Sequence, residues 1–443
     1  MKYTAITPPD WLGYSAIYQI NPRTFSKEGT IRAVTEELKT IRELGFRVVY
    51  LCPIFTEDDS EDRDFWSIRQ KKSETGNPKN PYRMNDYFSV DVEYGTADDL
   101  HAFVKEAHAL GMRVLLDLVY LHIGPEAEIL KLHPEFARQD RDGNPICGQW
   151  NFPLLDYRCS GLREYLWCNM VYYISVFDVD GFRCDVADGV PLDFWTEGKR
   201  RIRAVKSDAV LIEEGVNKSF LAESFESLYF FDWHETIYSV IQKGGNRNAI
   251  RETWEKWNSD APKGMMSLHG IDNHDTVTDW PKRVETLIGH SGMELLEAMT
   301  YVIDGIPMVY AGNELGDEAK LSLFANRFHM GKFETTDRSI ASRDYSIRRQ
   351  TVMKALNRLK ETSDVLRFGK TFWLSDANSG TVVAFSREYS GKSITFIGNL
   401  GDDRADFPSD KAESRKVLLS SESTPVILGG KVSLEPWTYI TIE

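Results

Sequence analysis

The chain has 443 residues, of which 42% are hydrophobic, and its formal net charge at pH 7 is −14. This length allows one large domain and a smaller second one. The acidic charge argues against nucleic acid or an anionic membrane as a partner, because both require a basic patch. The sequence shows neither an apolar secretion signal nor a run of roughly 18 apolar residues, and its five cysteines lack metal-ligand spacing, so we expect a cytoplasmic protein.

Strand-like and helix-like segments alternate from the amino terminus to about residue 362. The expected strands occupy 16–20, 48–54, 114–120, 181–186, 209–214, 228–233, 266–272 and 307–312. The expected helices occupy 31–44, 98–110, 161–177, 191–206, 235–259, 293–304 and 345–360. Eight strands that alternate with helices predict an α/β fold with a closed parallel TIM (β/α)8 barrel. A doubly wound open sheet is the alternative, but no Gly-x-Gly-x-x-Gly turn follows the first strand.

The remaining residues have a different pattern. Short runs of alternating apolar and polar residues occur at 371–374, 381–385 and 393–397, and turn residues separate them at 378–380 and 429–430. This pattern is typical of antiparallel strands joined by tight turns. We therefore expect a barrel over 1–362 and a C-terminal antiparallel β-sandwich over 363–443.

An arginine and an aspartate lie two residues apart at the end of the strand expected at 181–186. Residues two apart in a strand point to the same side, so Arg183 and Asp185 should project together. A guanidinium beside a carboxylate keeps the carboxylate ionised at neutral pH, as a nucleophile or a metal ligand requires. On this motif alone, a structural ion pair explains the pattern equally well.

Two further strands end in acidic residues. The strand at 209–214 ends in Glu213 and Glu214, and the strand at 266–272 leads into His274 and Asp275. Parallel barrels assemble their active sites at the C-terminal ends of the strands. An unpaired buried carboxylate is costly, so acids at three strand ends indicate catalysis rather than packing.

Together these segments resemble the α-amylase family of glycoside hydrolases over nearly the whole chain. The four signature regions of that family, on barrel strands three, four, five and seven, correspond to 117–122, 181–188, 211–215 and 271–275. Supporting segments follow in the family's order at 18–25, 81–87, 94–96 and 305–314. Each segment alone is a weak signal, whereas the ordered set is specific.

The resemblance implies retaining cleavage of α-1,4-glucosidic bonds in maltodextrins or starch-type glucans, as an α-amylase or maltogenic amylase performs it. Asp185 would be the nucleophile, Glu214 the acid and then the base, and Asp275 the residue that binds sugar hydroxyls in the transition state. Arg183 would keep Asp185 ionised while Glu214 stays protonated. Alignment places the acid at Glu214 rather than at Glu213, and adjacent strand residues face opposite ways.

The resemblance also assigns side chains that bind the sugar before the cleaved bond. His122 and His274 would donate hydrogen bonds to this sugar, and Tyr82 would stack on its ring. Each histidine has an alternative interpretation as a structural residue with satisfied hydrogen bonds. Tyr82 could equally be an aromatic residue that covers the core.

The sequence departs from the family at two places. Leu121 stands where most members have an asparagine that binds a structural calcium, and leucine offers no oxygen to an ion that takes six to eight. We therefore expect no cofactor and no metal, and a short inserted domain B at about 121–160. The residues at 187–189 replace a Lys-His pair that many members use beyond the cleaved bond, so the leaving-group subsites should differ. The continuation at 190–195 resembles compact bacterial α-amylases.

Two alternatives to hydrolysis remain open. An α-glucan transglycosylase or isomerase, with trehalose- or sucrose-type chemistry, would use the same covalent intermediate and differ only in the group that attacks it. A non-catalytic binding relative would usually lack one of the three acids, and this chain has all of them. In each case the expected partner is an α-glucan oligosaccharide or polysaccharide, and the sequence does not indicate an oligomeric state.

Overall fold

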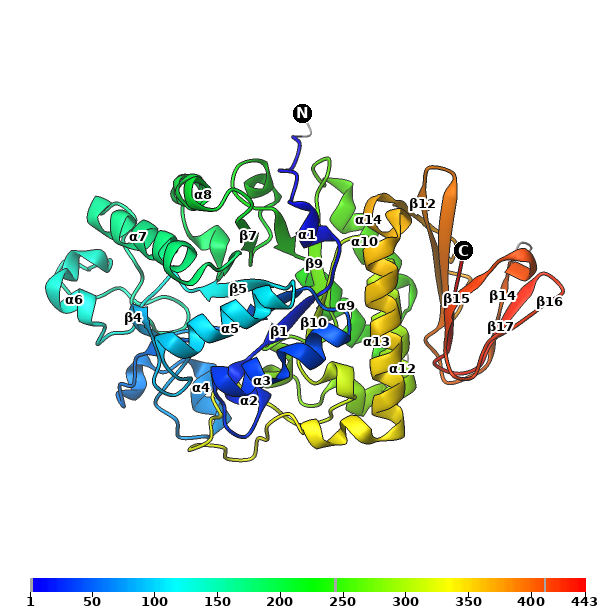
Figure 1. Cartoon of the computed structure of the whole chain (residues 1–443), viewed down its shortest axis with the longest axis horizontal. Helices are drawn as coiled ribbons and strands as arrows, with labels where there is room; N and C mark the ends of the chain where they lie inside the picture. Colours follow the sequence, from blue (N-terminus) through cyan, green and yellow to red (C-terminus); the bar gives the residue numbers. More distant parts are fainter. Residues whose placement is uncertain (1–2, 243–244, 410–411) are drawn as a thin grey trace.

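The computed structural model describes residues 3–242, 245–409 and 412–443. Eight parallel strands form a closed barrel, in the order β1-β10-β9-β8-β7-β6-β5-β2 around its circumference (Figure 1). The strands are β1 (Ile17–Ile20), β2 (Val48–Leu51), β5 (Arg113–Leu118), β6 (Gly181–Cys184), β7 (Val210–Glu213), β8 (Ser227–Tyr229), β9 (Ser267–Gly270) and β10 (Ile306–Tyr310). The predicted TIM barrel is confirmed.

Alternate residues of the barrel strands belong to two separate apolar clusters. Ile17, Val48, Val210 and Ile212 belong to a cluster that fills the barrel interior. Their strand neighbours, Leu211 for example, pack in the larger cluster beneath the helices. Because side chains alternate along a strand, this pattern determines which residue at each strand end faces the axis of the barrel.

The helices surround the barrel. The long ones are α3 (Ile31–Glu43), α5 (Ala97–Ala109), α7 (Ser160–Phe177), α8 (Leu192–Val205), α9 (Phe231–Ile241), α10 (Asn248–Ser259), α12 (Val284–Val302) and α13 (Asp344–Thr362). Helix α5 shows how local sequence sets a boundary. Thr96 accepts a hydrogen bond from the backbone N–H of Asp99, whose side chain accepts one from the N–H of Thr96, a reciprocal cap that satisfies two free donors.

Three of the predicted boundaries are wrong. The helix expected over 235–259 is two helices, α9 and α10, because the glycines and asparagine at 244–246 are poor helix formers. The strand expected at 228–233 ends at Tyr229, since α9 begins at Phe231. Helix α12 begins at Val284 rather than at 293, and Gly289 interrupts it with a φ of 72°.

The chain between β5 and α7 contains the segment expected to form domain B. Its regular structure consists of α6 (Glu128–Leu132), the 3-10 turn η2 (Pro134–Phe136) and isolated β-bridges. Next to it lie the paired strands β3 (Phe55–Glu57) and β4 (Met84–Val90) and the short helix α4 (Ile68–Ser73). These segments form one side of the opening of the barrel.

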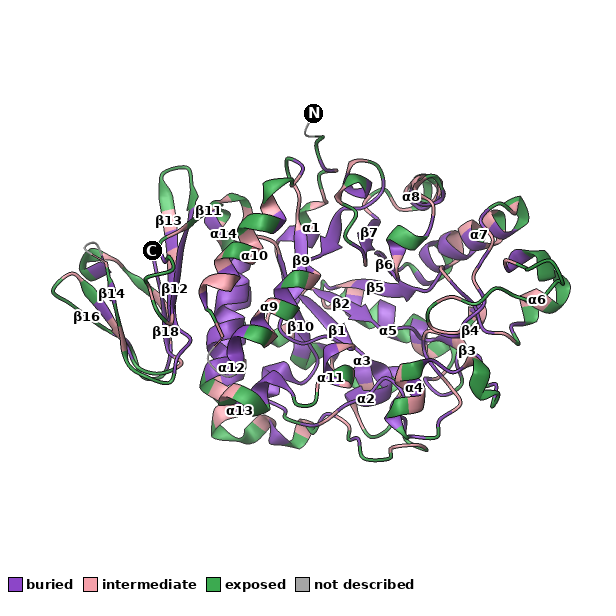
Figure 2. Cartoon of the chain, turned by 180° about the vertical axis from the view of Figure 1, so that it is seen from behind, coloured by how far each residue is buried: buried purple, intermediate pink, exposed green. Residues whose placement is uncertain are grey.

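The C-terminal part is a two-layer antiparallel sandwich, as predicted. Its strands are β11 (Lys370–Trp373), β12 (Val382–Tyr389), β13 (Lys392–Asn399), β14 (Ala405–Pro408), β15 (Val417–Ser420), β16 (Val426–Leu428), β17 (Lys431–Leu434) and β18 (Tyr439–Ile442). One sheet has the order β11-β12-β13-β18-β15 and the other β14-β17-β16, with an apolar layer between them. Figure 2 shows α12, largely buried, between the barrel and the larger sheet. Among the described residues, no helix is long and apolar enough to cross a membrane.

Candidate active site

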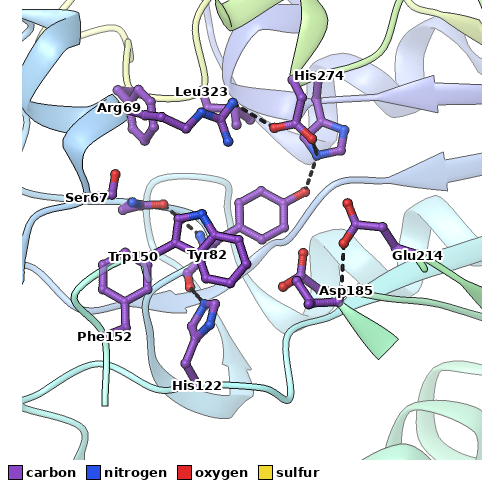
Figure 3. Close-up of a pocket in the computed structure, with 14 residues that line it drawn as sticks. Ser67, Arg69, Tyr82, His122, Trp150, Phe152, Asp185, Glu214, His274 and Leu323 are labelled. Atoms are coloured by element: carbon purple, nitrogen blue, oxygen red, sulfur yellow. Dashed lines mark hydrogen bonds and ion pairs between the residues drawn. The ribbon is translucent and has the colours of Figure 1, made fainter. Parts of the chain in front are cut away.

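A pocket of about 490 Å³ opens at the C-terminal ends of the barrel strands (Figure 3). Its walls contain residues from the strand ends and from the loops around them. The lining residues are Ser67, Arg69, Asn80, Tyr82, His122, Trp150, Phe152, Asp185, Val186, Glu214, His274, Asp275, Leu323 and Phe324. The pocket therefore contains six of the seven predicted site residues, and the seventh, Arg183, lies directly beneath it.

The Arg183 guanidinium is the centre of the charged floor of the pocket. Its Nη1 lies 2.6 Å from Asp117 Oδ1 and 2.9 Å from Asp185 Oδ1, and its Nη2 lies 2.6 Å from Glu214 Oε1. The side chain of Arg183 is only 1% exposed. One buried cation therefore contacts carboxylates from the ends of three neighbouring strands, and it brings Asp185 and Glu214 together.

The ionisation of this floor differs from the expectation that Arg183 holds Asp185 in its charged form. Burial and the nearby Glu214 raise the pKa of Asp185 well above its usual value, although Arg183 opposes the shift. Burial also raises the pKa of Glu214, again against Arg183. One guanidinium cannot keep three adjacent buried carboxyls ionised. Asp185 and Glu214 therefore titrate as a pair.

The two adjacent glutamates point in opposite directions. Glu214 faces the pocket, where its Oε2 accepts a hydrogen bond of 2.7 Å from the Val186 N–H. Glu213 faces away from the pocket, where its Oε1 accepts one of 3.1 Å from the Asn217 N–H. Burial, with a smaller effect from Asp188, raises the pKa of Glu213 to about 8. The alternation that puts Ile212 in the barrel interior explains why Glu214 also faces inward.

Asp275 has the opposite electrostatic environment. Its Oδ1 lies 2.7 Å from Arg69 Nη2, and its Oδ2 lies 3.3 Å from His274 Nε2. Burial alone would raise the pKa of Asp275, but His274 and Arg69 outweigh burial and lower it. The pKa of Asp275 is thus shifted in the opposite direction to those of Asp185 and Glu214.

A chain of hydrogen bonds holds Tyr82 and His274. Gln19 Nε2 donates to His274 Nδ1 at 2.8 Å, and Gln19 Oε1 accepts from the His274 N–H at 3.2 Å. His274 Nε2 then donates to Tyr82 Oη at 2.8 Å, and Tyr82 Oη donates to Asp117 Oδ2 at 3.0 Å. Burial lowers the pKa of His274, and the neighbouring Asp275 opposes this shift. The chain fixes the Tyr82 ring, which lines the pocket.

His122 offers an acceptor rather than the donor that we expected. Its Nε2 donates to the Tyr82 carbonyl at 2.8 Å, and burial lowers the pKa of the ring to about 4. Its buried Nδ1 has no hydrogen-bond partner within the described ranges. In a neutral ring whose Nε2 carries the proton, Nδ1 is an acceptor. A sugar hydroxyl could therefore donate to His122.

Sequence reasoning assigned no role to several residues of the site, including Asp117, Trp150, Phe152 and Arg69. Asp117 lies inside a signature region, and its contact with Arg183 could have been inferred from the neighbouring strand. Trp150 and Phe152 flank the His122 ring, with centroid separations of 5.5 Å and 4.9 Å. Two aromatic residues in a polar insertion were a usable signal. Arg69 lies on the short helix α4, which is too brief to give a periodic pattern in the sequence.

The absence of calcium at Leu121 stays a prediction. Within residues 3–242, 245–409 and 412–443, no three His, Cys, Asp or Glu side chains are placed to share a metal. A fixed cation lies in the neighbouring loops instead. The buried guanidinium of Arg83 donates to the carbonyls of Phe65 and Pro78 at 2.8 Å, and to those of Asp58 and Ser60 at 3.1 Å. These contacts hold the loop that contains Tyr82 without a metal.

The chain is similar to known proteins over most of its length. The model of the α-amylase catalytic-domain family matches residues 16–142 and 148–381. A cyclomaltodextrinase from Thermoanaerobacter pseudethanolicus is 22% identical over 447 residues, which cover 88% of this chain and 71% of the relative.

Two solved structures share the fold. A maltogenic α-amylase from Thermotoga neapolitana has a TM-score of 0.80 at 21% identity, over 97% of this chain and 98% of its own. An α-amylase from Lactobacillus plantarum has a TM-score of 0.80 at 24% identity, over 98% and 99%. These two likenesses cover both the barrel and the C-terminal sandwich.

Proposed function

The chain belongs to the α-amylase family of glycoside hydrolases, and from this premise we propose that it hydrolyses α-1,4-glucosidic bonds in maltodextrins with retention of configuration. The names of the similar proteins, a cyclomaltodextrinase and a maltogenic α-amylase, support an α-glucan substrate. The observation that carries the proposal is the contact of Asp185 and Glu214 with one buried guanidinium at the floor of a pocket.

In the first step, Asp185 attacks the anomeric carbon while Glu214 protonates the glycosidic oxygen. The carbon–oxygen bond to the leaving sugar breaks, and a covalent glycosyl-enzyme forms on Asp185. Retaining glycosidases need their two carboxyls roughly 5 Å apart for this division of roles. Contact with neighbouring nitrogens of one guanidinium supports such a separation. One proton shared between the two carboxyls is also the ionisation that the step requires.

In the second step, Glu214 acts as the base. It takes a proton from water, whose oxygen attacks the anomeric carbon and releases Asp185. The raised pKa of Glu214 suits both roles, because the group must exchange its proton near neutral pH. Attack by a sugar hydroxyl in place of water would give transglycosylation.

Asp275 supports both steps without forming a covalent bond. Its lowered pKa keeps it anionic, so it accepts hydrogen bonds from sugar hydroxyls. Positive charge develops on the sugar ring in the transition state, and a fixed anion stabilises that charge more than it stabilises the ground state. The Tyr82 ring, held by its hydroxyl, would lie along the same sugar.

The proposal is tested with maltoheptaose as substrate. We expect wild-type enzyme to release reducing sugar whose first-formed anomer, followed by NMR, is α. Asp185→Asn should reduce this rate by at least about a thousandfold. The matched control is Asp98→Asn, which removes an exposed carboxylate from the first turn of α5, away from the pocket, and should keep the rate within about twofold. A β anomer, or a fully active Asp185→Asn, would contradict the proposal. Products longer than the substrate after addition of glucose would favour transglycosylation over hydrolysis.

A further inference from the structure

Arg69 forms part of the pocket wall beside Asp275. It lies on α4, and its guanidinium bridges the two ends of α11 (Thr276–Asp279). Nη2 lies 2.7 Å from Asp275 Oδ1, at the start of this helix, and Nε lies 2.9 Å from Asp279 Oδ1, at its end. Figure 3 shows the Arg69 side chain extending along the top of the pocket towards His274. The floor mechanism described above assigns no role to this arginine.

The wall around Arg69 is packed protein. Ser67, Asn80, Leu323 and Phe324 all line the pocket and are at most 3% exposed. The Arg69 guanidinium carbon lies 5.8 Å from the centroid of the Phe324 ring. In Figure 3, Arg69, Ser67 and Leu323 lie on the side of Tyr82 opposite to Asp185 and Glu214. Packed side chains therefore form the wall of the pocket on the side away from the proposed acid.

Arg69 is held in place from two sides. Its two carboxylate partners fix the guanidinium, and the side chain is 31% exposed. The helix that carries it is fastened by its neighbour Gln70, which is 1% exposed and donates to the carbonyls of Asn77 and Pro78 at 3.0 Å. Ser67 caps the helix by accepting from the Gln70 N–H at 3.0 Å. The position of Arg69 in the pocket wall is thus fixed by the folded structure.

One donor of Arg69 remains available to a ligand. Nε and Nη2 bind carboxylates, whereas Nη1 makes no hydrogen bond to any described residue. A guanidinium can only donate, so Nη1 is suited to the oxygen of a hydroxyl group. In the proposed reaction the leaving sugar lies towards Glu214. The opposite end of the bound sugar, where a preceding unit would attach, therefore lies towards Arg69.

We propose that Arg69 recognises the free non-reducing end of the glucan, so that the enzyme removes units from chain ends and does not cut inside the chain. This inference rests on the proposed hydrolysis and specifies which glucans the site accepts. The terminal sugar fills the pocket, its end hydroxyl accepts a hydrogen bond from Arg69, and the wall leaves no path for a preceding sugar. Chains without a free end, or with a substituted one, are excluded.

The test uses two p-nitrophenyl maltoheptaosides that differ only in a 4,6-O-ethylidene block on the non-reducing end. The loss of each substrate is followed by chromatography. Wild-type enzyme should consume the free substrate at least about tenfold faster than the blocked one. Equal rates would overturn the inference and leave the proposed hydrolysis intact. If neither substrate is consumed, the proposed hydrolysis itself fails.

Variants test whether Arg69 causes the difference in rate between the free and the blocked substrate. Arg69→Met should reduce the rate on the free substrate, because Asp275 loses a partner, but it should narrow the ratio of free to blocked rates by about tenfold. Asp279→Asn leaves the Arg69–Asp275 contact in place and should narrow the ratio less. Lys72→Ala, which removes an exposed cation from the same helix, should leave it unchanged.

The ratio separates a specificity role from a structural one. If Arg69→Met lowers both rates equally, Arg69 only supports Asp275 and the inference is wrong. A thermal melt of each variant confirms that the compared proteins are folded.

Discussion

The floor and the wall of the pocket each contain an arginine paired with carboxylates, and the two pairs differ in construction. Arg183 is 1% exposed and contacts three acids at the ends of adjacent strands. Arg69 is 31% exposed and contacts two acids at the ends of one short helix. The strands of the barrel position the first pair, and loops position the second.

The difference between the floor and the wall corresponds to the two roles that we propose, catalysis at the floor and substrate selection at the wall. On the floor, burial and crowding of three acids raise the pKa values of the two that would react. At the wall, Arg69 and His274 lower the pKa of Asp275 and keep it anionic. In a barrel, residues at the strand ends can therefore carry out the reaction while the surrounding loops determine which glucans bind.

The largest expected effect tests the floor. Glu214→Gln should reduce hydrolysis of maltoheptaose by at least about a thousandfold but spare an α-glucoside with an activated aryl leaving group, which needs little protonation. Glu213→Gln is the matched control, because the same change one residue earlier faces away from the pocket. If Glu213→Gln shows this selective loss instead, the acid is assigned to the wrong residue.

A stability measurement compares the two arginines directly. Arg183→Met should lower the free energy of unfolding by about 3–5 kcal/mol, because it leaves three buried carboxylates without a cation. Arg69→Met should cost about 1 kcal/mol or less, since solvent screens a partly exposed pair. Urea unfolding at pH 7 measures both values. Similar losses of unfolding free energy in the two variants would contradict the proposed difference in burial and charge between the floor and the wall.

Glu213, which faces away from the pocket, should make the stability of the protein depend on pH. Its pKa rises from 4.5 to about 8 on folding, so the folded protein binds more protons than the unfolded chain between these values. Stability from this group therefore falls as pH rises through that window. Glu213→Gln should remove this dependence, so the free energy of unfolding of the variant relative to wild type should rise by about 3–4 kcal/mol between pH 5 and pH 8. An identical pH dependence in wild type and variant would count against a buried, uncharged Glu213.

The smallest expected effect concerns the loops beside the wall. The carbonyl contacts of Arg83 hold these loops with a protein cation, and we predict that excess EDTA leaves the Tm and the activity unchanged. A ligand that binds only the folded state would raise the Tm by mass action. A Tm that falls by several degrees in EDTA and recovers with calcium would show that a metal site exists after all.

The sequence was sufficient to predict the barrel and the floor because both depend on local periodicity. Eight apolar runs set the strand count, and the period of two indicated that Arg183 and Asp185 face the same space, whereas the choice of Glu214 came from the family resemblance. The same rule correctly set Glu213 apart from Glu214, because a strand cannot turn adjacent side chains to one side.

The wall and the ionisation of the floor depend on distant contacts. Arg69 contacts Asp275, which is 206 positions away in the chain. No local sequence pattern predicts this contact. The pKa of Asp185 depends on burial and on Glu214 and Asp117 from adjacent strands as well as on Arg183, so a motif that contains only the arginine does not predict the direction of the shift. The tautomer of His122 follows from a carbonyl in another loop.

The central claim is that Asp185 carries the glycosyl group, and trapping the intermediate tests it most directly. A 5-fluoro-α-glucosyl fluoride forms a glycosyl-enzyme that is hydrolysed slowly, and mass spectrometry of the intact and digested protein locates the adduct. We predict one 5-fluoroglucosyl group per chain on the peptide that contains Asp185, and no adduct in Asp185→Asn. An adduct on another residue, or turnover of the reagent with inversion and without any adduct, would contradict the account.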